Sequence, residues 1–158
     1  MKRTLLVLPV LLATACGGGG SAHSGGVSKA DYLQKAEAIC KQANTDQKAL
    51  KTPAGVDDLA PYVGKLVELA DTATTQVVAL EMPKADKAEL DKKVLQPLKK
   101  QVVAGKAYAA KVTAAAKAQD QAELVKLLSS PPNGAKADLA WMRTYGFKEC
   151  VAAADTRG

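Results

Sequence analysis

The chain has 158 residues, of which 47% are hydrophobic but only 4% aromatic, and it contains 30 alanines. This length is typical of one domain, and a core of small aliphatic side chains favours closely packed helices over sheets. The 24% of charged residues and the net charge of +6 are ordinary for a soluble globular protein and indicate neither disorder nor an integral membrane fold.

The chain begins with the three parts of an export signal peptide. Lys2 and Arg3 give a basic start, residues 4–12 form an apolar run too short to cross a bilayer as a helix, and residues 13–15 are small. We therefore expect residues 1–15 to be a signal peptide that is removed from the mature protein.

Cys16 follows this segment directly. The sequence Leu-Ala-Thr-Ala-Cys, ending at Cys16, resembles the lipobox of bacterial lipoprotein precursors. The resemblance implies cleavage before Cys16, a diacylglycerol thioether on its sulfur, and usually a further acyl chain such as palmitate on its new amino group. Because two or more acyl chains hold a protein stably on a membrane, we expect an anchor on the outer face of the cell membrane. An ordinary secretory signal with a chance cysteine is the alternative.

Residues 16–27 are predicted to be a flexible tether that starts at the lipidated cysteine. The segment is rich in Gly and Ser and has almost nothing to bury. Ten such residues have an end-to-end distance of about 17 Å, which keeps the folded domain close to the lipid surface. His23, the only histidine, lies here, so we expect it to have neither a metal nor a catalytic role.

The folded domain is predicted to span residues 28–158 and to begin with a helix. Ser28, followed three residues later by Asp31, is a helix-capping pattern. Apolar residues then recur at three- and four-residue spacing as far as about Lys51, before a loop that contains Pro and Gly. A second amphipathic helix should follow, capped by Asp57 or Asp58 and ending near residue 80.

The third helix is predicted from about residue 85 to residue 118 and has two irregular points. Pro97 should kink it, because proline lacks the backbone N–H that the helix needs. Gly105 lies on its apolar face, where the missing side chain would let a neighbouring helix approach. A slot for a ligand is the alternative interpretation of Gly105.

Between positions 92 and 118, the third helix has seven lysines and no acidic residue. At 100° per residue these lysines fall on one broad face, and we expect them to have no i,i+4 ion-pair partner. The second helix is acidic, but Glu68 and Asp71 are not expected to reach them. We predict that this face docks on an anionic membrane or wall polymer; a solvated face that keeps the protein soluble is the alternative. The seven are Lys92, Lys93, Lys99, Lys100, Lys106, Lys111 and Lys117.

Two shorter helices should complete the domain, over residues 121–128 and about 133–145. Gly146 followed by Phe147 indicates a left-handed C-cap with its hydrophobic contact. No segment alternates at period two, as a half-buried strand would. The sequence therefore predicts an all-α, up-and-down bundle of four or five helices.

Cys40 and Cys150 are the remaining cysteines. An exported pair meets an oxidising compartment and is most simply a disulfide. Closing a loop of about 110 residues is worth roughly 4 to 5 kcal/mol in the chain-entropy model. The alternative, a redox-active pair, usually lies in a Cys-x-x-Cys turn, which is absent.

Two short motifs around these cysteines also resemble a known group of proteins. They are Ala-Asp-Tyr-Leu-Gln-Lys-Ala-Glu-Ala-Ile-Cys at residues 30–40 and Tyr-Gly-Phe-Lys-Glu-Cys at residues 145–150. Both resemble segments of small Ala-rich secreted lipoproteins of actinobacteria. The resemblance spans the mature domain and implies a helical architecture with one disulfide, but it implies no activity.

We predict no catalytic residues, no metal ligands and no cofactor. The expected folded domain has no histidine, no Gly-x-Ser-x-Gly and no Ser-x-x-Lys, which excludes the common serine nucleophiles, and histidine is also missing for a helix-bundle metal site. Nucleic-acid binding is not expected, because arginines and stacking aromatics are few. The alternative is a wall-glycan hydrolase that acts through carboxylates alone. Its candidate residues are Asp57, Asp58, Glu68, Asp71 and Glu81.

The sequence thus favours a non-enzymatic envelope lipoprotein that binds a partner protein, a wall polymer or a small ligand. A lipid-carrying or lipid-surface module is the second interpretation, and it requires an apolar pocket between the helices. Trp141 and Tyr145 are expected to pack in the core or against a helix cap. An exposed aromatic pair that holds a sugar or a partner is the alternative for these two residues.

Overall fold

The computed structural model describes residues 26–132 and 135–155, and in these ranges the regular structure is helical throughout, with no strand. The elements in chain order are α1 (Lys29–Ala49), α2 (Val56–Ala79), α3 (Lys87–Leu90), the π-helical turn η1 (Asp91–Leu95), α4 (Gln96–Lys117), α5 (Gln121–Ser129), α6 (Leu139–Tyr145) and α7 (Glu149–Asp155). The all-α class is confirmed.

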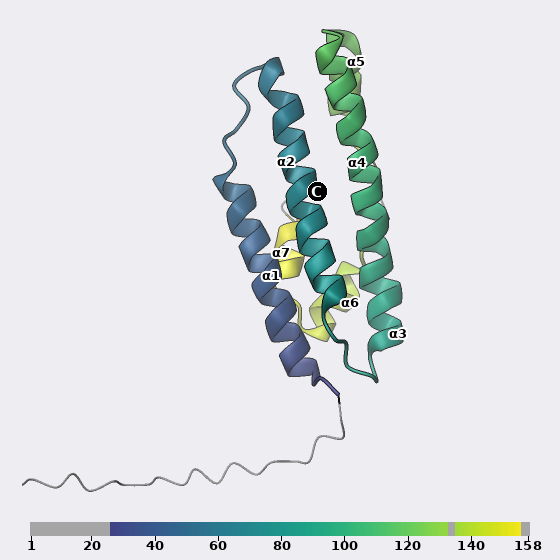
Figure 1. Cartoon of the computed structure of the whole chain (residues 1–158). Helices are drawn as coiled ribbons and strands as arrows, with labels where there is room; N and C mark the ends of the chain where they lie inside the picture. Colours follow the sequence, from purple (N-terminus) through teal and green to yellow (C-terminus); the bar gives the residue numbers. More distant parts are fainter. Residues whose placement is uncertain (1–25, 133–134, 156–158) are drawn as a thin grey trace, which may run out of the picture.

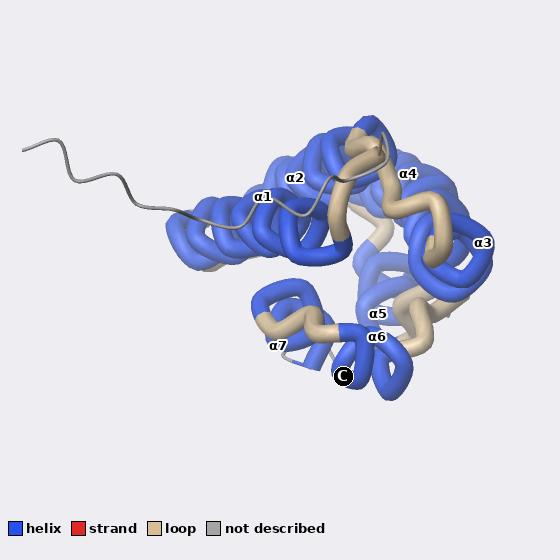
Figure 2. Tube along the Cα trace, turned by 90° about the horizontal axis from the view of Figure 1, so that it is seen from below, coloured by secondary structure: helices blue, strands red, loops and turns tan. Residues whose placement is uncertain are grey.

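The three long helices run up and down as neighbours in one curved layer, with α2 between α1 and α4 (Figure 1). Seen along the helices, α6 and α7 lie on the concave side of this layer (Figure 2). At the end of the molecule opposite to α3, the helix α5 folds back against α4 (Figure 1). The predicted up-and-down bundle is therefore present, closed on one side by the C-terminal helices.

The first helix begins where the sequence predicts. The Ser28 hydroxyl accepts a hydrogen bond of 3.1 Å from the backbone N–H of Asp31. Tyr32 and Ala36, one turn apart, are fully buried. The second helix differs from the prediction at its start, because Gly55 is its N-cap and makes no side-chain cap bond. The carboxylate of Asp58 instead reaches back from the first turn to accept from the N–H of Ala54 at 3.0 Å.

The predicted third helix is one continuous run of α3, η1 and α4, and its irregularity lies just before Pro97. The π-helical turn covers Asp91–Leu95, and the N–H of Gln96 bonds to the carbonyl of Asp91. In an unbroken α-helix, the carbonyl of Lys93 would accept from residue 97, which is a proline without an N–H. The carbonyl of Lys93 instead accepts a hydrogen bond of 3.0 Å from the backbone N–H of Asp138.

The C-terminal part differs most from the sequence prediction. The last predicted helix, over residues 133–145, is shorter: it starts at Leu139, and residues 135–138 are not helical. Asp138 caps it by accepting from the N–H of Trp141 at 2.9 Å, so the helix cannot extend further back. Residues 133 and 134 lie outside the described residues. The helix α7 was not predicted, because its seven residues are too short to show an amphipathic period.

The predicted left-handed C-cap of α6 is confirmed. Gly146 has φ of 118°, and the N–H of Phe147 donates to the carbonyl of Met142 at 3.0 Å. This bond is part of a Schellman motif, which turns the chain sharply and directs the Phe147 side chain inward. Phe147 is only 2% exposed.

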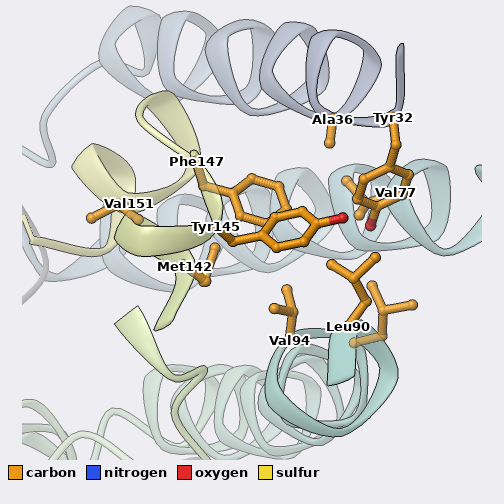
Figure 3. Packing of buried hydrophobic residues seen from close by; sticks show 10 residues of the cluster. Tyr32, Ala36, Val77, Leu90, Val94, Met142, Tyr145, Phe147 and Val151 are labelled. Atoms are coloured by element: carbon orange, nitrogen blue, oxygen red, sulfur yellow. The ribbon is translucent and has the colours of Figure 1, made fainter. Parts of the chain in front are cut away.

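The main core lies between α1, the α3–η1 turn region and the C-terminal helices (Figure 3). Tyr145 and Phe147 project from the C-terminal segment into the space between Tyr32 and Val94 (Figure 3). A second, smaller cluster joins α2, α4 and α5 at the other end, around Val112, Ala115 and Leu124.

Candidate functional site

Five of the seven lysines predicted to bind an anionic surface are exposed and make no ion pair with any residue that the structure describes. Helix α4 has no acidic side chain, and its buried residues Val112 and Ala115 face α2 and α5. Lys92 lies in the preceding turn η1, and the other four lysines lie on α4. The five are Lys92, Lys99, Lys100, Lys111 and Lys117.

Lys93 and Lys106 have acidic partners, and here the sequence prediction was wrong. The ammonium of Lys93 lies 3.0 Å from the carboxylate of Glu89, one helical turn earlier. The helical run begins at Lys87, so Glu89 is available as an i,i+4 partner. The same ammonium lies 5.3 Å from the centre of the Trp141 ring. Lys93 is therefore engaged with α6 and its own helix.

The ammonium of Lys106 lies 2.8 Å from the carboxylate of Asp71 on α2, which was predicted to be out of reach. The two helices approach closely beside it. A Cβ placed on Gly105 would be 3.4 Å from Val67 Cγ2, so Gly105 does allow a neighbouring helix to approach. Because Val67 fills this space, the alternative of a ligand slot at Gly105 is not supported.

Cys40 and Cys150 form the predicted disulfide, with their Cα atoms 4.9 Å apart. The bond joins the middle of α1 to the first turn of α7. It therefore holds the C-terminal helix on the concave side of the layer (Figure 2).

Glu37 is a residue whose role the sequence analysis missed. Its carboxylate accepts hydrogen bonds from the backbone N–H groups of Lys148 at 3.0 Å, Glu149 at 2.7 Å and Cys150 at 3.3 Å. These are donors that the first turn of a helix leaves without an intrahelical partner. Glu37 thus caps α7 from another helix. Its position three residues before Cys40, on the same face of α1, was the available signal.

Trp141 and Tyr145 pack as predicted rather than forming an exposed pair. Their rings stack at 4.7 Å between centroids, and Tyr145 stacks on Phe147 at 5.5 Å. The hydroxyl of Tyr145 donates to the carboxylate of Asp86 at 2.7 Å. Burial, followed by this hydrogen bond, raises the pKa of Tyr145 well above its usual value. The ammonium of Lys29 lies 4.1 Å from the centre of the Tyr145 ring.

Three of the five carboxylates considered for glycan hydrolysis form ion pairs or hydrogen bonds, and the other two lie far from each other. Glu68 pairs with Lys65 at 2.7 Å, Asp71 pairs with Lys106, and Asp58 accepts from Ala54. Asp57 and Glu81 are exposed at opposite ends of α2. Within the described ranges, no three His, Cys, Asp or Glu residues come together as metal ligands would.

Two open depressions lie at the end of the bundle that is distant from the main core. One is beside the α1–α2 connection, between Pro53 and Tyr62, and has Lys51, Asp58 and Lys65 on its rim. The other lies between the start of α2 and the end of α4, next to Asp57 and Lys117. Both are open and have charged side chains in their lining, whereas a lipid carrier requires an enclosed apolar pocket.

No helix in the described ranges combines the length and the apolar character that crossing a membrane requires. Cys16, the predicted signal peptide (residues 1–15) and most of the predicted tether (residues 16–27) lie outside the described residues. No protein-family model, curated protein or solved structure matches this chain.

Proposed function

We propose that the protein is a non-enzymatic lipoprotein, anchored through Cys16 to the outer face of the cell membrane, that binds an anionic component of the envelope through the lysines of η1 and α4. The observation that carries this proposal is the set of five exposed lysines without an acidic partner among the described residues. On most protein surfaces, charges of both signs are interspersed. A helix of 22 residues with no acidic side chain is therefore a feature that the fold itself does not require.

The two remaining lysines are expected to contribute less to binding than the exposed five. Lys93 and Lys106 already have partners, so their charge is partly compensated. The exposed five keep their full charge toward solvent. Near an anionic lipid surface, each lysine contributes about 1 kcal/mol of binding free energy, within a Debye length of roughly 8 Å at physiological salt. The tether predicted for residues 16–27, about 17 Å in end-to-end distance, would keep the domain close to such surfaces.

Cosedimentation tests this proposal with the full chain carrying Cys16→Ser, which removes the acylated sulfur. The probes are phosphatidylcholine vesicles containing phosphatidylglycerol, and purified wall material. We expect binding at low ionic strength that weakens steeply with added salt. The triple variant Lys92→Gln, Lys99→Gln and Lys100→Gln should bind about tenfold more weakly or worse.

A matched control removes the same charge from the opposite edge of the layer. The variant Lys35→Gln, Lys41→Gln and Lys48→Gln changes three exposed lysines of α1 and should bind almost as the parent does. Equal weakening by the two triple variants would show that only net charge matters and would contradict a binding role for α4. The absence of binding to both probes at low salt would also contradict it.

A further inference from the structure

The outward face of α4 carries two rows of lysines with a strip of small side chains between them. At 100° per residue, Lys99, Lys106 and Lys117 fall within about 20° of one line, and Lys100 and Lys111 lie roughly 110° around the helix. The strip between the rows consists of four exposed residues at spacings of four, three and four. They are Val103, Ala107, Ala110 and Ala114.

The tertiary contacts of α4 show that this strip faces away from the rest of the domain. Lys106 reaches Asp71, so the first row borders α2. On the other flank, the hydroxyl of Tyr108 donates to the carbonyl of Leu127 on α5 at 3.2 Å, so the second row lies toward α5. Val103, between the rows, is 68% exposed. The strip is therefore open along its length.

From these positions we propose that the outward face of α4 binds one linear polyanion in an extended conformation, with phosphate or phosphodiester groups, lying along the strip between the two lysine rows. This inference rests on the proposed function and specifies its partner. Small side chains let a chain approach the helix closely, and ammonium groups on both sides can reach its anionic groups. The stretch from Lys99 to Lys117 is about 27 Å long.

The composition of the face favours a flexible polyanion over a nucleic acid. The two rows and the strip contain no arginine and no aromatic side chain. Bidentate phosphate recognition is a property of arginine, and sequence-tolerant binding of single strands depends on aromatic stacking. Lysine ammoniums act as point charges instead, so they recognise the repeat of negative charge and little else.

The same composition disfavours a bilayer surface as the partner. Helices that lie in the membrane interface insert large apolar side chains such as Leu, Phe and Trp. Three alanines and one valine offer little apolar area by comparison. The helix also starts near the end of the bundle where α1 begins and runs away from it (Figure 1). A chain anchored before α1 therefore presents this face along a line leading away from its anchor.

Binding measurements with the full chain carrying Cys16→Ser test the inference. The probes are linear polyphosphate of several tens of phosphates, tripolyphosphate, and phosphatidylglycerol-containing vesicles. We expect polyphosphate to bind at least tenfold more tightly than tripolyphosphate. A plot of the logarithm of the affinity against the logarithm of salt concentration should have a slope of roughly −3, as for neutralisation by the four lysines of the rows that make no ion pair, on a single strand.

Three double variants locate the binding and separate the partners. Lys99→Gln with Lys111→Gln removes one charge from each row and should weaken polyphosphate binding about tenfold, whereas Lys35→Gln with Lys41→Gln on α1 should change it less than twofold. Ala107→Leu with Ala110→Leu adds bulk between the rows without changing charge. This variant should weaken polyphosphate binding. It should leave vesicle binding unchanged or strengthen it, because the leucines add apolar area.

The outcomes distinguish this inference from the proposed function. Vesicles bound more tightly than polyphosphate, or polyphosphate binding that the two leucines leave unchanged, would overturn the linear polyanion, while binding lost through the α4 lysines would still support the proposed function. If neither polyphosphate nor vesicles bind at low salt, both proposals fail. Unfolding curves like the parent's would show that the variants retain the fold.

Discussion

The carboxylate of Glu37 accepts a hydrogen bond of 2.7 Å from the backbone N–H of Glu149, 112 positions later in the chain. An acidic side chain is favourable here because it meets the positive end of α7, where N–H groups lack intrahelical partners. One turn further along α1, Cys40 is bonded to Cys150. Asn44 follows and donates to the carbonyl of Glu149 at 3.1 Å. One face of α1 thus holds α7 through side chains on three successive turns.

Removal of the Glu37 carboxylate should therefore loosen α7. We expect Glu37→Ala to lower the free energy of unfolding by about 1 to 3 kcal/mol, because three backbone donors, two of them part-buried, lose a charged acceptor. Urea denaturation measures this change. Glu68→Ala is the control, since Glu68 makes only an exposed pair with Lys65, and such pairs contribute 0 to 1 kcal/mol. Equal destabilisation by both variants would show that the contacts of Glu37 do not matter.

The disulfide should contribute more than any single side chain. Because its loop is long, Cys150→Ser is expected to lower the free energy of unfolding by up to roughly 4 to 5 kcal/mol. In the native protein isolated from the envelope, Cys40 and Cys150 should react with thiol reagents only after reduction and unfolding. Two thiols that can be alkylated in the native protein would contradict this prediction.

Gly146 and Gly64 give a pair of opposite predictions. At Gly146, φ is 118° and an added Cβ would lie 3.0 Å from Leu33 Cδ1, so Gly146→Ala should destabilise the domain by about 1 to 2 kcal/mol. At Gly64 in α2, an added Cβ meets nothing within 4 Å, so Gly64→Ala should stabilise it by up to about 1 kcal/mol. Thermal unfolding of both variants tests this; a shift of the same sign in both would contradict it.

Tyr32 should make stability fall at alkaline pH. Its hydroxyl is buried without a hydrogen-bond partner among the described residues, and burial raises its pKa to about 12 from the usual 10. The folded state then holds a proton that the unfolded state loses, so the contribution is complete below pH 10 and disappears as the pH rises through 12. A rise of two pKa units corresponds to a loss of about 2 to 3 kcal/mol in the free energy of unfolding.

Tyr32→Phe isolates this effect. It removes an unpaired buried hydroxyl, so we expect it to leave stability at pH 7 unchanged or slightly higher. Its unfolding free energy should also fall less between pH 10 and 12 than that of the parent. Urea denaturation at several pH values measures both quantities. A variant with the parent's alkaline profile would show that Tyr32 is not the titrating group.

The anchor prediction concerns a residue outside the described part of the chain. Cys16→Ser should prevent the proposed lipidation and move the protein out of the membrane fraction, because the diacylglycerol thioether of the proposal would form on that sulfur. Cell fractionation and mass measurement of the mature N-terminal peptide test it. A variant that remains membrane-bound, together with a parent that carries no lipid mass, would contradict the lipoprotein proposal.

Much of the fold follows from local patterns in the sequence. The apolar periods of the long helices, the Ser28 cap and the Gly146 turn each depend on residues within a few positions of one another, so they can be recognised without the tertiary structure. The pairing of Cys40 with Cys150 also followed, because exclusion of Cys16 by the expected lipidation leaves these two. The seven lysines and the absence of acidic residues among them are likewise properties of the chain alone.

Tertiary packing decided the ion pair of Lys106. Lys106 and Asp71 belong to different helices, and only the close approach of α2 and α4 beside Gly105 brings their charges within 2.8 Å. The short α7 shows the same limit more strongly: seven residues are too few to be stable as an isolated helix, and it forms where Glu37 and Cys40 meet its first turn. Its existence depends on contacts more than a hundred positions apart, which no local pattern contains.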